Sequence, residues 1–144
     1  MTSEINFYQV DETIIKSLAP LLLKILDEKR KVLIFCKTSA QIKTIDDSLW
    51  SYGRNKFIPH ITIADKEFVL ERQPILISDK EENANQADYL VFLDLPAVSF
   101  ANSFSRVFYF FEEQNLAVAK EVATKIKPTN SYKKTDGKWV KFSL

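Results

Sequence analysis

The stretch Lys31-Val-Leu-Ile-Phe-Cys36 decides the fold class of this chain of 144 residues. Its apolar run from Val32 to Cys36 is typical of a β-strand that is covered on both faces. The run leads through Thr38-Ser-Ala-Gln41, a capping-box pattern, into an amphipathic segment that ends at Leu49-Trp50. One buried strand followed by one helix is the repeating unit of an α/β sheet, so we expect this architecture for the whole chain.

Other segments repeat this alternation of strand and helix. Four of them are rich in β-branched and aromatic residues and read as strands: 5–10, 74–79, 89–94 and 106–111. Helical spacing of apolar residues predicts helices near 14–26 and 115–127. Pro20 either bends the first of these helices or sits in a first turn capped by Ser17. Segment 60–68 could hold a short irregular strand, and the tail after Thr129 is polar until Lys138.

We therefore expect an α/β fold: a three-layer α/β/α Rossmann-like sandwich with a mostly parallel five-stranded sheet. We take the strand order as 3-2-1-4-5, numbered along the chain. The length fits a single domain over residues 1–144.

Composition narrows the class of protein. The chain is 46% apolar with 11 Phe, which is enough for a folded core. Its only cysteine, Cys36, has no partner for an internal disulfide, which points to a reducing compartment. The sequence has no apolar run of membrane-spanning length and no signal-peptide pattern at Met1. We expect a cytoplasmic protein that does not contact a membrane.

Charge is unevenly distributed along the chain. Residues 117–144 hold seven lysines against Glu121 and Asp136, a local net charge of +5, although the whole chain carries only +1. A basic end suits an acidic partner, either nucleic acid or an acidic peptide. A lysine-rich tail that is merely solvated remains the alternative.

Nucleotide binding finds no support in the sequence. An α/β nucleotide site needs a glycine-rich turn after its first strand. The chain has two glycines, Gly53 and Gly137, and neither follows a strand. The turn after the first strand is Asp11-Glu12, whose charges would repel phosphate. We expect no cofactor.

Catalytic groups are equally sparse. Asp79 and Asp94 end strands and could hold Mg²⁺ for a phosphohydrolase, but the expected strand order separates them by three strand spacings, about 14 Å at ~4.8 Å each. Cys36 and the single histidine, His60, could form a nucleophilic pair, yet inert packing is the commoner use of such residues. No nucleophile-elbow serine motif is present. We expect no catalytic and no metal-binding residue.

A binding surface is the better-supported reading. Phe57-Ile58-Pro59 follows Arg54 and Lys56, and the last helix presents Lys120 and Lys125 outward. An apolar pocket rimmed by lysines suits a peptide with acidic residues and a terminal hydrophobic residue. On local evidence alone, Phe57 could instead belong to the core.

The order of several short motifs resembles the chi subunit of bacterial DNA polymerase III. These motifs are Phe7-Tyr8, Val32-Leu-Ile-x-Cys36, Leu49-Trp50, Phe57-Ile-Pro-His60, Gln73-Pro74-Ile-Leu, Ala87-Asp88 and Trp139. The resemblance covers nearly the whole length. Its most specific part is Leu-Trp followed by Phe-x-Pro-His.

The resemblance implies a non-catalytic accessory subunit of the replicative holoenzyme. Such a subunit would pair with the psi subunit in the clamp-loader complex and bind the acidic C-terminal tail of single-stranded DNA-binding protein. It would therefore reach DNA indirectly during replication.

The family's tail pocket uses a Phe and a Lys that match Phe57 and Lys125 here. This chain departs from the family pattern at Glu121 and Thr124, where a basic and an aromatic residue are expected. Either Lys120 compensates for Glu121 or the tail is held more weakly. The alternatives from other classes are direct nucleic-acid binding through the same lysines and, third, a Mg²⁺-dependent phosphohydrolase.

Overall fold

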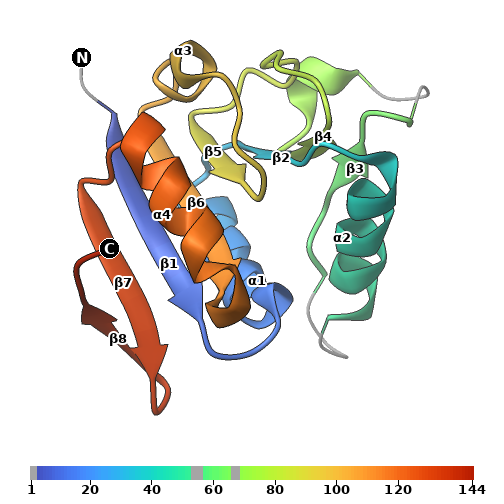
Figure 1. Cartoon of the computed structure of the whole chain (residues 1–144). Coiled ribbons are helices and arrows are strands. Elements are labelled where there is room, and N and C mark those ends of the chain that lie inside the picture. The colour runs from blue at the N-terminus through green and yellow to red at the C-terminus, as the bar shows by residue number, and fades with distance from the viewer. Residues whose placement is uncertain (1–2, 53–56, 66–68) are drawn as a thin grey trace.

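The computed structural model describes residues 3–52, 57–65 and 69–144, and it shows one sheet with helices on both sides (Figure 1). The strands are β1 (Glu4–Val10), β2 (Val32–Phe35), β3 (Ile61–Thr62), β4 (Ile75–Ser78), β5 (Tyr89–Phe92), β6 (Arg106–Glu112), β7 (Asn130–Thr135) and β8 (Lys138–Lys141). The helices are α1 (Ile14–Asp27), α2 (Ser39–Ser51), α3 (Val98–Ala101) and α4 (Leu116–Lys125), with 3-10 turns η1 (Leu70–Arg72) and η2 (Glu113–Asn115).

The sheet has eight strands in the order β3-β4-β2-β5-β6-β1-β7-β8. Every pairing is parallel except the last, between β7 and β8. The α/β class and the mostly parallel sheet are confirmed, whereas the expected five strands are wrong. The expected order is also wrong, because β1 lies between β6 and β7 rather than beside β2. Strands close in sequence usually lie side by side. Here the connection through α1 takes the chain from β1 past β6 and β5 to β2.

Each face of the sheet has its own apolar core. One core joins α1 and α2 to inward residues such as Ile34, Val91 and Phe108. The other core joins α3 and α4 to alternating residues of the same strands, among them Leu33 and Phe92. Strands β2, β4 and β5 are buried at every position, as the apolar run from Val32 predicts.

The helix predictions are largely confirmed. Thr38 caps α2 as expected, because its side chain accepts from the N–H of Gln41 while the Gln41 side chain accepts from the N–H of Thr38. Pro20 lies inside α1, which begins at Ile14, so the alternative of a first turn capped by Ser17 is wrong. Helix α4 ends at Lys125, and the buried Ile126 follows it before Pro128.

The remaining strands lie near the edges of the sheet. The short strand considered for segment 60–68 is β3, which has two residues; the end of that segment, 66–68, lies outside the described residues. Strands β7 and β8 form a hairpin in the polar tail, where no strand was predicted. No helix within the described ranges is both long enough and apolar enough to cross a bilayer.

Candidate functional site

Phe57 is a surface residue. Its side chain is 67% exposed, so the alternative that it belongs to the core is wrong. The Phe57 ring lies 5.7 Å from the ring of Trp50, which is itself 60% exposed at the end of α2. Two large aromatic rings therefore form an exposed pair, while Ile58 next to them is buried. The neighbouring cations Arg54 and Lys56 lie outside the described residues.

The α4 residues of the predicted site are all exposed: Lys120, Thr124 and Lys125. The Thr124 hydroxyl already donates a hydrogen bond of 2.6 Å to the carbonyl oxygen of Glu121. Glu121 is exposed as well, so its carboxylate lies on the surface that carries Lys125. A negative charge therefore stands where an acidic ligand would approach these lysines.

A pocket of about 230 Å³ adjoins Lys125. Its apolar walls come from β6, the β5–α3 loop and α4: Leu93, Leu95, Tyr109, Val118 and Val122. Two ammonium groups line it, from Lys37 and Lys125, and so do the carboxylates of Asp94 and Glu121. Asp94 Oδ2 accepts a hydrogen bond of 2.9 Å from the backbone N–H of Lys37. The pocket thus combines apolar walls with side chains of both charges.

Phe57 and Lys125 belong to opposite sides of the sheet. Phe57 packs against Trp50 of α2, and α2 lies in the core shared with α1. Lys125 ends α4, which packs in the other core with α3. Figure 1 shows α4 in front of β1 and β6, well separated from α2 at the right-hand edge of the view. Among the described residues, the pocket beside Lys125 does not include Phe57, whose ring packs against Trp50 instead.

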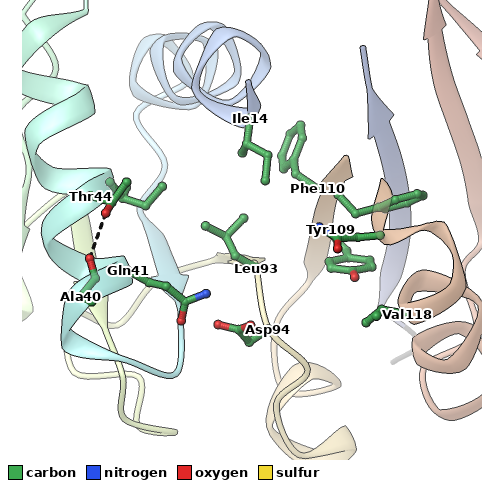
Figure 2. A pocket seen from close by; sticks show the side chains of 12 residues that line it. Ile14, Ala40, Gln41, Thr44, Leu93, Asp94, Tyr109, Phe110 and Val118 are labelled. Atoms are coloured by element: carbon green, nitrogen blue, oxygen red, sulfur yellow. Dashed lines mark hydrogen bonds between the residues drawn. The ribbon is translucent and has the colours of Figure 1, made fainter. Parts of the chain in front are cut away.

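A second pocket, of about 530 Å³, lies at the carboxyl ends of β5 and β6 (Figure 2). Figure 2 shows Leu93, Tyr109 and Phe110 facing this space together with Asp94 and Gln41. Two of its polar side chains are already engaged, because Gln41 belongs to the α2 capping box and Asp94 accepts a hydrogen bond from the Lys37 N–H. Burial, and secondarily Asp94, raises the pKa of Tyr109 to about 12, so its hydroxyl stays protonated. These features do not form a phosphate cradle.

The Mg²⁺ hypothesis gains nothing from the geometry. Because β2 lies between β4 and β5, Asp79 and Asp94 follow strands two spacings apart, about 10 Å, and not the expected three. Ligand oxygens lie only about 2.0–2.6 Å from such an ion, so one ion does not bridge that gap. The described residues contain no group of three or more His, Cys, Asp or Glu side chains suited to a metal.

The Cys36–His60 pair has no nucleophilic geometry. Cys36 is fully buried, and desolvation, followed by Asp94 and Asp79, raises the pKa of its thiol to about 12. Both ring nitrogens of His60 have other partners, the carbonyl oxygen of Ile58 at 2.7 Å and Asp46 Oδ1 at 2.9 Å. A thiol held neutral and a histidine engaged on both sides are packing groups.

Sequence reasoning missed two residues that the structure exposes beside the candidate site. Trp50, read only as the end of an amphipathic segment, forms the exposed pair with Phe57. Lys37 lines the pocket of Lys125, and its position directly after the buried strand β2 was the available signal. Residues that follow parallel strands meet at the carboxyl edge of the sheet, where α/β proteins bind ligands.

Comparison with known proteins identifies the family. The family model described as "DNA polymerase III chi subunit, HolC" matches residues 1–127. The chain is 32% identical over 105 residues to the DNA polymerase III subunit chi of Haemophilus influenzae, covering 72% of this chain and 67% of that protein. It is 34% identical over 77 residues to subunit chi of Pseudomonas aeruginosa, covering 54% of this chain and 51% of that protein.

A third relative is the probable subunit chi of Rickettsia prowazekii, 30% identical over 87 residues, with 60% of this chain and 52% of that protein covered. The matches thus span about half the length of the Pseudomonas and Rickettsia relatives.

Solved structures with low sequence identity share the fold. The Hef helicase domain of Pyrococcus furiosus superposes with a TM-score of 0.59 and 16% identity, over 76% of this chain and 27% of that one. The structure of the E. coli DEAD-box protein SrmB bound to RraA contains a chain with a TM-score of 0.57 and 12% identity, over 94% of this chain and 92% of that one. The motif order read from the sequence and the match over residues 1–127 agree, and the chain belongs to the family of DNA polymerase III chi subunits.

Proposed function

We propose that this chain is a non-catalytic accessory subunit that links the DNA polymerase III clamp-loader complex to single-stranded DNA-binding protein. It would bind the acidic C-terminal tail of that protein and pair with a psi subunit, so that it contacts DNA indirectly. Membership of the chi family supports a role within the DNA polymerase III assembly. The observation that carries the tail interaction is the apolar pocket beside Lys125.

The pocket chemistry supports a peptide with a hydrophobic C-terminal residue. Leu95, Val118 and Val122 offer an apolar wall for the last side chain. Lys37 and Lys125 supply ammonium groups for the terminal carboxylate. Lys120, five residues earlier on α4, adds a further exposed charge for acidic residues upstream.

Two carboxylates in the same pocket oppose an acidic ligand. Asp94 already accepts a hydrogen bond from the backbone N–H of Lys37, so one of its oxygens is engaged. Glu121 is exposed and free to repel a neighbouring aspartate of the peptide. We therefore expect binding to be weak and to decrease with added salt, because exposed charges are screened within about 10 Å at 0.1 M salt.

Phe57 is the second proposed contact. Together with Trp50 it offers an exposed aromatic surface of the kind that anchors peptides. Because Phe57 and Lys125 lie on opposite sides of the sheet, a peptide that touches both must cross an edge of the molecule. A tail peptide of about twelve residues is long enough to test this, since an extended chain covers about 3.3–3.6 Å per residue.

Titration of a labelled acidic tail peptide tests the proposal. Lys125→Ala and Phe57→Ala should each weaken binding by roughly 1–3 kcal/mol, and Lys120→Ala and Thr124→Ala by less. Lys43→Ala is the matched lysine control, because Lys43 is exposed on α2 and pairs with Asp47 at 3.1 Å. Val69→Ala is the control for Phe57→Ala, because Val69 is an apolar residue that is 56% exposed and lies outside the proposed contacts.

Glu121→Lys provides a sharper arm of the same titration. Replacing the opposing carboxylate by an ammonium should strengthen peptide binding and steepen its salt dependence. Unchanged affinity in both Lys125→Ala and Phe57→Ala would reject the proposed contacts. The function itself would fail if single-stranded DNA-binding protein bound equally well with and without its C-terminal residues.

A further inference from the structure

A row of aromatic rings crosses four neighbouring strands on the α1 side of the sheet. Tyr8 of β1 lies nearly parallel to Phe110 of β6, with ring centroids 5.1 Å apart and an interplanar angle of 19°. On its other side Tyr8 stacks on Tyr132 of β7, at 5.4 Å and 16°. Trp139 of β8 meets Tyr8 edge to face, at 5.2 Å and 72°. The row therefore runs to the edge of the sheet.

This part of the sheet face has no helix over it. Among the described elements, the main packing of α1 is against β6 and α2, and that of α2 is against α1, β3 and β4. Tyr8 and Tyr132 are half-buried, and Trp139 is 40% exposed. Between these rings and α1 lies a groove of about 290 Å³, lined on the helix side by Pro20, Leu21 and Lys24. We call it the aromatic groove.

The charges around the aromatic groove are positive. Lys24 lines it directly, and Lys134 Nζ lies 5.5 Å from the centre of the Trp139 ring. Lys141 stands opposite Tyr132 in the β7–β8 register and so shares its face. No carboxylate lines the groove in the described ranges, and Asp136 lies in the hairpin turn.

We propose that the aromatic groove binds single-stranded nucleic acid. A base would stack on the exposed Trp139 ring, which the row of stacked rings behind it supports, and phosphates would pair with Lys24, Lys134 and Lys141. Proteins that hold single strands without sequence preference combine these two elements, aromatic platforms and a basic track. This contact with nucleic acid is direct and separate from the tail-binding surface on α4, so it goes beyond the proposed function.

The combination favours a single strand over other partners. A purely apolar peptide would leave the ammonium groups without counter-charges, and an acidic peptide makes no special use of an exposed indole ring such as that of Trp139. A duplex keeps its bases stacked on each other, so their faces do not reach Trp139. A single strand offers unstacked bases and one phosphate per nucleotide at once.

Fluorescence anisotropy with a labelled oligothymidine, free of any coating protein, tests this proposal on the full chain. Trp139→Ala should weaken binding about tenfold, and Trp139→Phe should keep most of the affinity because a ring remains. Lys134→Ala and Lys24→Ala should each reduce the slope of log K against log salt by about 0.7. Val140→Ala is the control, because Val140 is 48% exposed and points to the opposite face of β8.

The outcomes separate this proposal from the tail-binding one. Lys125→Ala should leave oligothymidine binding unchanged, and Trp139→Ala should leave tail-peptide binding unchanged. Equal affinity of wild type, Trp139→Ala and Lys134→Ala for the oligonucleotide would overturn the proposal. Full competition by duplex DNA would also overturn it, because it would mean charge attraction without stacking. Full competition by an acidic peptide would mean that the groove is a peptide site. A thermal melt of each variant confirms that it is folded.

Discussion

His60 Nε2 lies 2.9 Å from Asp46 Oδ1, and this contact ties the segment before β3 to the middle of α2. The second ring nitrogen, Nδ1, lies 2.7 Å from the carbonyl oxygen of Ile58. The Trp50 ring packs 4.9 Å from the same imidazole, which places His60 beneath the exposed pair of Trp50 and Phe57.

Removing this link should destabilise the fold. Asp46→Ala leaves the buried His60 ring without one partner and should lower the free energy of unfolding by about 1–3 kcal/mol. Asp46→Asn keeps an acceptor oxygen and should cost less. The measurement is urea unfolding followed by circular dichroism. Asp47→Ala is the control, because Asp47 sits in an exposed pair with Lys43, and its effect should stay within about 0.5 kcal/mol. Equal losses in the two alanine variants would contradict the structural role of the contact.

The Cys36 thiol should be unreactive in the folded protein. Burial disfavours the thiolate and raises its pKa to about 12, so at pH 8 the reactive form is on the order of 10⁻⁴ of the total. A chromogenic disulfide reagent should therefore modify Cys36 at the rate of unfolding, and rapidly in denaturant. Rapid stoichiometric labelling of the native protein would show that the thiol is accessible.

The same pKa shift predicts a loss of stability at alkaline pH. The raised pKa means that the folded state keeps its proton after the unfolded chain has lost it. This contribution is intact below the ordinary value of 9.0 and is lost as pH rises towards about 12. Burial raises the pKa of Tyr109 as well, which acts in the same direction. Urea unfolding at several pH values should show a smaller alkaline decrease in Cys36→Ala than in wild type.

Lys29→Gly should stabilise the protein. Lys29 follows α1 with a φ of 58°, a left-handed conformation that side chains with a Cβ disfavour. The N–H of Arg30 bonds to Ile25 O and that of Lys29 to Leu26 O, the two bonds of a Schellman motif. Glycine fits this position without strain, so we expect a gain of up to about 1 kcal/mol in thermal or urea unfolding. Lys16→Gly, inside α1, should instead cost about 1 kcal/mol.

Pro20→Ala should also stabilise the protein. Pro20 occupies the interior of α1, where it lacks an N–H for the helix and crowds the preceding turn. Its side chain is exposed, so alanine creates no core cavity. We expect a gain of roughly 1–3 kcal/mol in urea unfolding. A loss of stability would mean that the proline ring contributes more through its packing at the aromatic groove than it costs the helix.

The sequence predicted the buried strands well because burial on both faces leaves a direct signature, as in the run from Val32 to Cys36. It did not predict the strand order, since nothing local in Ile5 to Val10 states which strands will flank it. The pairing of β1 with β6 joins residues about 100 positions apart, Glu4 with Arg106 and Val10 with Glu112. Such long-range pairing depends on how the whole sheet packs.

The hairpin of β7 and β8 was missed although it carries a local signal. Asp136-Gly137 connects the two strands with φ values of 50° and 76°, as a two-residue hairpin turn requires. The lysines around it suggested a solvated tail. The strand register, in which Lys134 pairs with Trp139, was therefore not recognised. The exposed Trp50 was missed for a related reason, because helical spacing gives the direction of a side chain and not what covers it.

Both edge strands of the sheet have features that disfavour pairing with a strand from another molecule. At one margin β3 has two residues, too few to template another strand. At the other margin, every residue of β8 is exposed and lysines stand at both ends, Lys138 and Lys141. A second copy approaching β8 would bring its own lysines into register with these, and the like charges would repel it. The short β3 at one margin and the lysines of β8 at the other therefore both disfavour edge-to-edge pairing of the sheet with a second copy.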